Sequence, residues 1–194
     1  MWKFLPTPTT SEVDKYLKLR DSLENYVLQE KALDKLFFDV CPKNSNIEDI
    51  LIKCCTLNDF YSTNIFSIFP VAKHILELNI DDRLKNGDTS LVNDIASIKI
   101  NWRELNFYSF ATKYCSHHFP LDFPIYDNYV EKCLLYFKSK DKFYNFKKID
   151  LKNYPKFKEI LIKFTDFYWL NPYNLKEIDK YLRQLGKEFF PKKY

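Results

Sequence analysis

Apolar residues recur every three or four positions along most of the chain, which is the spacing of one face of an α-helix. Capping residues, prolines and the turn sequence Asn86-Gly87-Asp88 separate these segments and mark where helices begin and end. We expect a bend at Pro70, and we expect Gly186 to lie just past the end of the last helix. The predicted helices cover about residues 12–31, 32–40, 47–59, 65–78, 90–98, 107–118, 126–137, 157–169 and 175–185.

Glycine is scarce, because Gly87 and Gly186 are the only two among 194 residues. Tight two-residue β-hairpins favour glycine, since their central residues adopt positive φ, and phosphate-binding loops also depend on it. The scarcity therefore argues against a β-sandwich, a P-loop and a dinucleotide-binding fold. Since there is also no internal repeat and no long linker, the sequence predicts one compact all-α domain over residues 1–194.

The cysteines and the N-terminus bear on the cellular compartment. Five cysteines form no CxxC pair, which argues against a disulfide framework or a zinc knuckle and favours reduced, buried thiols. The start Met-Trp-Lys-Phe-Leu-Pro lacks the apolar core of a signal peptide. No apolar run reaches the roughly 18 residues of a membrane span. We therefore expect a cytoplasmic protein that does not enter the membrane.

Two segments of the chain carry candidate chemistry. Lys113 lies in the apolar, aromatic sequence Ser109-Phe-Ala-Thr-Lys-Tyr-Cys115, within a predicted helix. Asp127 follows 14 residues later, after a loop bounded by Pro120 and Pro124, at the start of the next helix. A helix, a loop and a helix can bring Lys113 and Asp127 to one cleft. The plain alternative is a salt bridge between two adjacent helices.

A lysine amine attacks carbon only when it is neutral, and an ordinary lysine is neutral in roughly 0.04% of molecules at pH 7. Lowering its pKa to about 7 takes roughly 4.6 kcal/mol. Burial against Phe107, Phe110 and Tyr114 acts in that direction, as does the positive end of the helix. This is how a lysine that forms a Schiff base is activated. A nearby carboxylate opposes the shift, but it stabilises positive charge that develops on a sugar ring.

These two segments resemble the helix-hairpin-helix DNA glycosylase superfamily, particularly its 8-oxoguanine DNA glycosylase (OGG-like) branch. That family has a nucleophilic lysine in a Thr-Lys pair, which Thr112-Lys113 matches. It has an aspartate after a Pro-Val or similar pair, which Pro124-Ile-Tyr-Asp127, followed by Val130, resembles. The whole chain, including residues 57–65 and 109–115, also resembles small OGG-fold proteins from bacterial anti-phage gene clusters of the CBASS type.

The resemblance implies an all-helical OGG-like fold, no cofactor and no metal. It also implies DNA as substrate, either single-stranded or as a duplex with the damaged base flipped into a pocket. Asn64 best matches the asparagine that fills the gap left by the flipped base. One departure concerns the hairpin, because residues 105–109 contain none of the glycines whose N–H groups grip a phosphate in that family.

Further side chains have a functional and a plain interpretation. His117, one helical turn after Lys113, faces the base pocket or is a surface histidine. Tyr126 and Tyr129 flank Asp127 and stack on a base or belong to the core. Gln184 reads a base edge or faces solvent. Cys115, His117, His118 and Asp122 are close together, but their spacing matches no standard zinc pattern.

Residues 138–158 hold eight lysines and two aspartates, a net charge of +6, although the whole chain carries +4. The segment includes Lys147 and Lys148 and is interleaved with aromatic residues, which suits a nucleic-acid backbone and exposed bases. The alternative is a solvated surface stretch whose rings point inward.

The sequence thus predicts a DNA N-glycosylase, with or without abasic-site lyase activity, that removes an oxidised or modified base. Lys113 is the expected nucleophile and Asp127 the expected carboxylate. One alternative is an inactive glycosylase fold that binds nucleic acid or other proteins of a defence complex. Another is a glycosidase that acts on free nucleosides.

Overall fold

The computed structural model describes residues 4–191 and is mostly helical, with one two-stranded antiparallel sheet among these residues. The all-α class predicted from the sequence is confirmed only in that the protein is mainly helical, because the small sheet was not predicted. The elements are α1 (Thr10–Asp21), α2 (Glu24–Asp34), a π-helical turn (Lys35–Val40), α3 (Ile47–Tyr61), α4 (Ile68–Leu78), α5 (Asp81–Lys85), α6 (Ser90–Ala96), β1 (Ser97–Ile100), β2 (Arg103–Asn106), α7 (Tyr108–His118), α8 (Asn128–Asp141), a 3-10 helix (Lys148–Lys152), α9 (Tyr154–Phe167) and α10 (Leu175–Phe189).

The chain forms two compact units. The central unit is Leu28–Ile125, and the terminal unit comprises the described parts of Met1–Val27 and Tyr126–Tyr194. The prediction that residues 1–194 form one domain stays a prediction.

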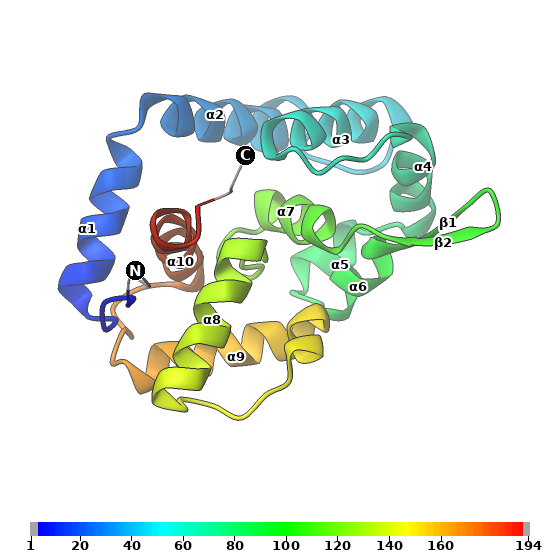
Figure 1. Cartoon of the computed structure of the whole chain (residues 1–194). Coiled ribbons are helices and arrows are strands. Elements are labelled where there is room, and N and C mark those ends of the chain that lie inside the picture. The colour runs from blue at the N-terminus through cyan, green and yellow to red at the C-terminus, as the bar shows by residue number, and fades with distance from the viewer. Residues whose placement is uncertain (1–3, 192–194) are drawn as a thin grey trace. The chain divides into compact units, whose positions relative to one another are not determined.

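The central unit is built around α3 and α7. Helix α3 packs against α4 and α7, and α6 packs against α7 (Figure 1). Side chains at positions i, i+3, i+4 and i+7 of α3 are buried, namely Ile50, Lys53, Cys54 and Leu57. Between α6 and α7 the chain makes a β-hairpin, in which β1 pairs with β2 and Ser97 lies opposite Asn106. Consequently α7 is preceded by a β-hairpin and not by a short helix-helix loop.

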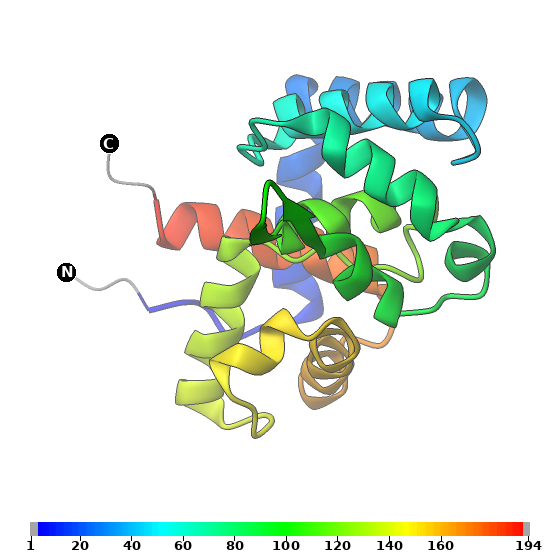
Figure 2. The ribbon, with the colours of Figure 1, turned by 90° about the vertical axis from the view of Figure 1, so that its right-hand side faces the viewer.

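In the terminal unit, α10 packs against α1, α8 and α9. Figure 1 shows α10 nearly end-on between α1 and α8, and Figure 2 shows its length. Its core is aromatic: Tyr16 and Tyr181 lie 5.8 Å apart between ring centroids, and Phe137 and Phe164 lie 5.6 Å apart. All four rings are buried.

Side-chain caps explain where the principal helices begin. The side chain of Asn46 accepts a hydrogen bond from Asp49 N at 2.8 Å at the start of α3, as predicted. Asn174 and Glu177 form a reciprocal capping box at the start of α10. Asp127 caps α8, so this helix begins at Asn128 and not at residue 126 as expected.

Several predicted boundaries are wrong for local reasons. The single helix expected over residues 12–31 is two helices, because α1 ends at Asp21 and Ser22 Oγ donates to Leu19 O at 2.7 Å. Pro70 lies in the first turn of α4, where a proline removes no intrahelical hydrogen bond, so no bend is required. The helix expected to end near residue 98 ends at Ala96, where β1 begins.

Gly186 does not end the last helix, because α10 continues to Phe189. A Cβ placed on Gly186 would lie 2.6 Å from Tyr129 Cβ and 3.0 Å from the Tyr129 carbonyl oxygen. This glycine is therefore a contact point where α8 and α10 approach closely. The turn predicted at Gly87 is confirmed, with φ of +64°.

We predict that Gly186→Ala lowers the free energy of unfolding by about 1–3 kcal/mol, because the added methyl group forces α8 and α10 apart. This loss would occur although alanine favours a helix over glycine by about 1 kcal/mol. Urea unfolding measures the effect. The matched control is Gly87→Ala, where a Cβ meets nothing within 4 Å and only the strain of positive φ is added. Equal stability of Gly186→Ala and wild type would contradict the close approach.

None of the helices within residues 4–191 combines the length and apolar character needed to cross a membrane.

Candidate active site

Lys113 lies in the middle of α7, the most deeply buried helix of the central unit. Ten of its eleven residues are buried, and the Lys113 side chain is only 3% exposed. The helix is anchored at its start, where Phe107 N donates to Ala96 O at 2.9 Å and Ala111 N donates to Phe107 O at 2.9 Å. The burial expected for Lys113 from its apolar surroundings is confirmed.

The Lys113 amine has specific partners in the central unit. Its Nζ donates to Ser109 O at 3.0 Å and to Ser109 Oγ at 2.5 Å, one turn earlier on α7. The same nitrogen lies 5.2 Å from the ring centroid of Tyr61, at the end of α3. A carbonyl, a hydroxyl and a π face therefore fix the position of the amine.

His117 stands one turn after Lys113 and is also buried. Its Nε2 lies 3.0 Å from the Tyr61 hydroxyl, and its ring lies 5.4 Å from that of Phe37. His117 thus holds Tyr61, whose ring contacts Lys113. The structure brings Lys113, His117 and Tyr61 into one cluster, of which the sequence predicted the first two.

Asn64 is exposed on the loop that follows Tyr61. It adopts the left-handed conformation, with φ of +58°. Asn58 braces this loop, because its Oδ1 accepts from Ile65 N at 2.9 Å and from Thr63 Oγ1 at 2.8 Å. The side chain of Asn64 is therefore presented by an ordered turn three residues after Tyr61.

Asp127 belongs to the terminal unit, whereas Lys113 belongs to the central unit, and their predicted pairing stays a prediction. Asp127 Oδ1 accepts from the backbone N–H groups of Tyr129 at 2.8 Å and Val130 at 2.9 Å. Its Oδ2 lies 3.1 Å from Arg183 Nε. The carboxylate therefore has a structural role as the N-cap of α8 and a cationic neighbour on α10.

Three further predicted residues lie in the terminal unit. Tyr126 is 3% exposed, and its hydroxyl donates to Glu131 Oε2 at 2.5 Å. Tyr126 therefore belongs to the core, and its ring is not accessible for stacking on a base. Tyr129 is partly exposed, and Lys132 Nζ lies 5.9 Å from its ring centroid. Gln184 is 7% exposed, so the expectation of a solvent-facing glutamine is wrong.

The basic segment 138–158 exposes lysines but not its main aromatic rings. Lys147 and Lys148 are exposed, and Lys148 Nζ forms an ion pair with Glu131 Oε1 at 3.2 Å. Four rings of the segment are buried, so the interpretation in which the rings point inward holds for them. These rings belong to Phe143, Phe146, Tyr154 and Phe157.

A second lysine, Lys53, is also buried, which was not predicted from the sequence. Lys53 is 0% exposed, and its Nζ donates to Asn44 Oδ1 at 2.6 Å and to Lys43 O at 2.9 Å. Asn44 Oδ1 also accepts from the Tyr114 hydroxyl at 2.6 Å, and Asn44 Nδ2 donates to Asp81 Oδ1 at 2.6 Å. The sequence signal was present, because Lys53 falls on the apolar stripe of α3 between Ile50 and Leu57.

Burial changes the titration of this network. It lowers the pKa of Lys53 from 10.5 to about 8, against the opposing effect of Asp81 and of Cys41, Asp49 and Cys54. Burial, together with Lys53 and His117, holds the pKa of His118 well below its usual range. Lys53 Nζ lies 3.4 Å from His118 Nε2, so a neutral His118 avoids repulsion between two cations.

We predict that the stability of the wild-type protein rises, relative to Lys53→Met, as the pH increases from about 8 to 10.5. In this window the unfolded chain keeps the Lys53 proton while the folded chain releases it, so folding is favoured by higher pH. The shift from 10.5 to about 8 corresponds to about 3 kcal/mol over the full window. Urea unfolding of both proteins at several pH values measures the difference. A difference independent of pH would contradict the burial of the amine.

Among residues 4–191 no group of three or more histidine, cysteine, aspartate or glutamate side chains is placed to hold a metal ion.

The geometry defines a mainly α-helical protein with a buried lysine cluster in its central unit. Residues 12–122 match the family model described as HI_0787_N, N-terminal domain, which covers more than half of the chain. The chain therefore belongs to this family. The matched region includes Lys113, His117 and Tyr61 and ends before Asp127.

A protein of Haemophilus influenzae (strain ATCC 51907 / DSM 11121 / KW20 / Rd), described as uncharacterized, is 53% identical over 171 residues. The alignment covers 88% of this chain and 78% of that protein. No solved structure matches the chain.

Proposed function

We propose that this protein is a DNA N-glycosylase of the OGG-like kind, with Lys113 as the nucleophile. The observation that carries the proposal is the buried Lys113 amine, which Ser109 and the Tyr61 ring hold in a fixed position. A lysine removed from water and fixed in this way is suited to covalent catalysis with a carbon electrophile. The segment around Thr112-Lys113 that resembles the glycosylases is the same segment that forms this site.

In the proposed reaction, the neutral Lys113 amine forms a bond to C1′ of the sugar. The bond between C1′ and the base nitrogen breaks, and the base leaves with the electron pair and takes up a proton. The bound amine then loses a proton. The nitrogen lone pair forms the C=N bond of the Schiff base as the C1′–O4′ bond breaks and O4′ takes up a proton, and β-elimination from this Schiff base can nick the strand. Asp127 would stabilise the positive charge that develops on the sugar ring. The reaction requires no metal or organic cofactor.

We infer that α6, the β-hairpin and α7 correspond to the helix-hairpin-helix element of the glycosylase fold. Helix α6 precedes the hairpin in sequence and α7 follows it. The two helices pack against each other, which supports this assignment. DNA is the proposed partner, with the excised base flipped out and Asn64 entering the gap. The exposed, left-handed position of Asn64 supports that role, and exposed Lys147 and Lys148 would contact phosphates. The proposed setting is anti-phage defence.

Base release from oligonucleotides tests the proposal. Duplex and single-stranded oligonucleotides that carry 8-oxoguanine, other modified bases or none are incubated with excess protein, and free base is measured. We expect release from at least one modified substrate, and a reduction of about 10²-fold or more in Asp127→Asn. Asparagine can still cap α8, so this variant retains the fold. No release from any oligonucleotide, with release from free nucleosides, would replace this proposal by a nucleoside glycosidase.

A second candidate is a non-catalytic module that keeps the glycosylase fold and binds nucleic acid or another protein. The observation that favours it is the engagement of Asp127, whose carboxylate caps α8 and lies beside Arg183. These contacts give the aspartate a structural reason to be present. Tight DNA binding without base release or covalent adduct would support this alternative.

A further inference from the structure

The tip of the β-hairpin is strained and carries an exposed tryptophan. Ile100 pairs with Arg103, so Asn101 and Trp102 form a two-residue loop, with φ of +45° and +64°. Such loops favour glycine at the second position, and a bulky residue there is destabilising. The Trp102 side chain is nevertheless 91% exposed, so packing in the fold does not account for it. A strained residue that contributes little to the core indicates a functional surface.

The two faces of the hairpin differ in character. Ile98 is buried and shares one face with Leu105, its partner across the strands. The opposite face is polar and contains the pair Lys99 and Glu104 and the pair Ser97 and Asn106. Trp102 is associated with this polar face, because Lys99 Nζ lies 5.6 Å from its ring centroid.

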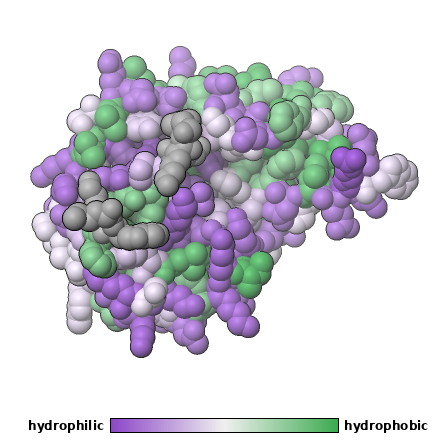
Figure 3. All heavy atoms as spheres, in the orientation of Figure 1, coloured by the Kyte–Doolittle hydropathy of each residue, from purple (hydrophilic) through white to green (hydrophobic). Residues whose placement is uncertain are grey.

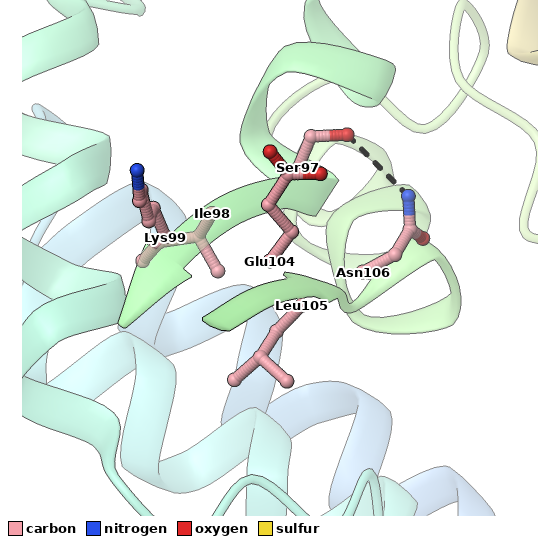
Figure 4. A pocket seen from close by; sticks show the side chains of 6 residues that line it. All are labelled: Ser97, Ile98, Lys99, Glu104, Leu105 and Asn106. Atoms are coloured by element: carbon pink, nitrogen blue, oxygen red, sulfur yellow. Dashed lines mark hydrogen bonds between the residues drawn. The ribbon is translucent and has the colours of Figure 1, made fainter. Parts of the chain in front are cut away.

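A pocket of about 420 Å³ lies along the hairpin and is lined by residues of both strands. Figure 4 shows Lys99 pointing away from Leu105, and Asn106 Nδ2 donating to Ser97 Oγ at 3.4 Å. Figure 3 shows strongly hydrophilic side chains partway along the hairpin and paler ones at its far end. The lining residues are Ser97, Ile98, Lys99, Glu104, Leu105 and Asn106.

We propose that the hairpin 97–106 binds an unpaired segment of nucleic acid, with a base stacked on Trp102. Lys99 lies beside the exposed indole, with its Nζ 5.6 Å from the ring centroid, and Arg103, next to Trp102 in sequence, adds a cation on the other face of the hairpin. Glu104 is the one carboxylate of the segment 97–106. An aromatic ring beside cations suits a base and its phosphate, because every base has a face to stack and every nucleotide a negative charge.

This inference goes beyond base removal, because binding at the hairpin does not depend on the chemistry of Lys113. The two are therefore separable by experiment. Binding of an unmodified single-stranded oligonucleotide without base release would leave this inference standing, whereas base release without such binding would overturn it.

The test compares Trp102→Gly with Trp169→Gly. Trp169 follows α9 in the terminal unit, is 83% exposed and also has positive φ, at +57°. Asp166, and not a cation, precedes it by three residues. Glycine relieves the same backbone strain at both sites, so each variant should have a melting temperature at least equal to that of wild type.

Fluorescence anisotropy with a labelled single-stranded oligonucleotide at low salt measures binding. We expect Trp102→Gly to weaken affinity by roughly 10-fold or more, and Trp102→Phe to retain part of it. Trp169→Gly should leave affinity unchanged. Lys99→Gln should reduce the slope of log affinity against log salt by about one. Negligible binding by wild type, or equal effects of Trp102→Gly and Trp169→Gly, would overturn the proposal.

Discussion

Lys113→Gln is expected to reduce base release on the order of 10³-fold or more, because the substitution removes the nucleophile of the proposed reaction. Glutamine retains a donor for Ser109 O and avoids a buried charge, so the variant should fold. Single-turnover measurement of base release, with excess protein, reports the chemical step directly. Circular dichroism and thermal unfolding verify that the central unit is intact.

Two other lysine variants separate chemistry from structure. Lys113→Arg places a permanent cation at this position but provides no nucleophilic amine at neutral pH, so it should be as inactive as Lys113→Gln. Lys73→Gln, on the exposed face of α4 in the same unit, should release base at the wild-type rate. Full activity in a folded Lys113→Arg would show that Lys113 acts only through its charge.

Asn44→Leu is expected to lower the free energy of unfolding by about 3–5 kcal/mol. Asn44 is 2% exposed and joins Lys53, Tyr114 and Asp81 in one buried network. Leucine has a similar volume but accepts and donates no hydrogen bond. The substitution would leave the Lys53 ammonium and the Tyr114 hydroxyl without this partner inside the protein, and unpaired buried polar groups are costly.

Asn46 provides the matched control, since it is the same residue type two positions later in the sequence. It is exposed and caps α3, so Asn46→Leu should cost only about 1 kcal/mol. Chemical denaturation compares the two variants. If Asn44→Leu proved no more destabilising than Asn46→Leu, the network would contribute little to stability.

The helical character of the chain could be predicted because it depends on local patterns. Asn46 caps α3 and the capping box at Asn174 begins α10, and both signals are contained within four residues of sequence. The burial of Lys113 followed from its aromatic neighbours on one helix. In each case the deciding interactions are short in range.

The β-hairpin could not be predicted from glycine content, because neither residue of its turn is a glycine. Asn101 and Trp102 adopt the positive φ angles of the turn, although positive φ is unfavourable for a bulky residue such as tryptophan. Gly186 was assigned to a helix end from its conformational preference, whereas its lack of a Cβ serves contact with Tyr129 on another helix. Such tertiary contacts leave no local signal.

The candidate site was predicted only in part, because some of its residues come together through tertiary contacts. The cluster of Lys113 and His117 follows from spacing on α7, but Tyr61 comes from a helix about fifty residues earlier. The burial of Gln184 and Tyr126 depends on packing within the terminal unit. The burial of Lys53 could have been predicted from its position on the apolar stripe of α3, although a charged residue on such a stripe is usually exposed.

Borohydride trapping tests the central claim most directly. The protein is incubated with oligonucleotides that contain an abasic site or 8-oxoguanine, reduced with borohydride and analysed for a covalent protein–DNA adduct. We predict an adduct with wild type that is absent in Lys113→Gln and maps to Lys113 by peptide analysis. No adduct in folded wild type, or an adduct that persists in Lys113→Gln, would contradict the assignment of Lys113 as the Schiff-base nucleophile.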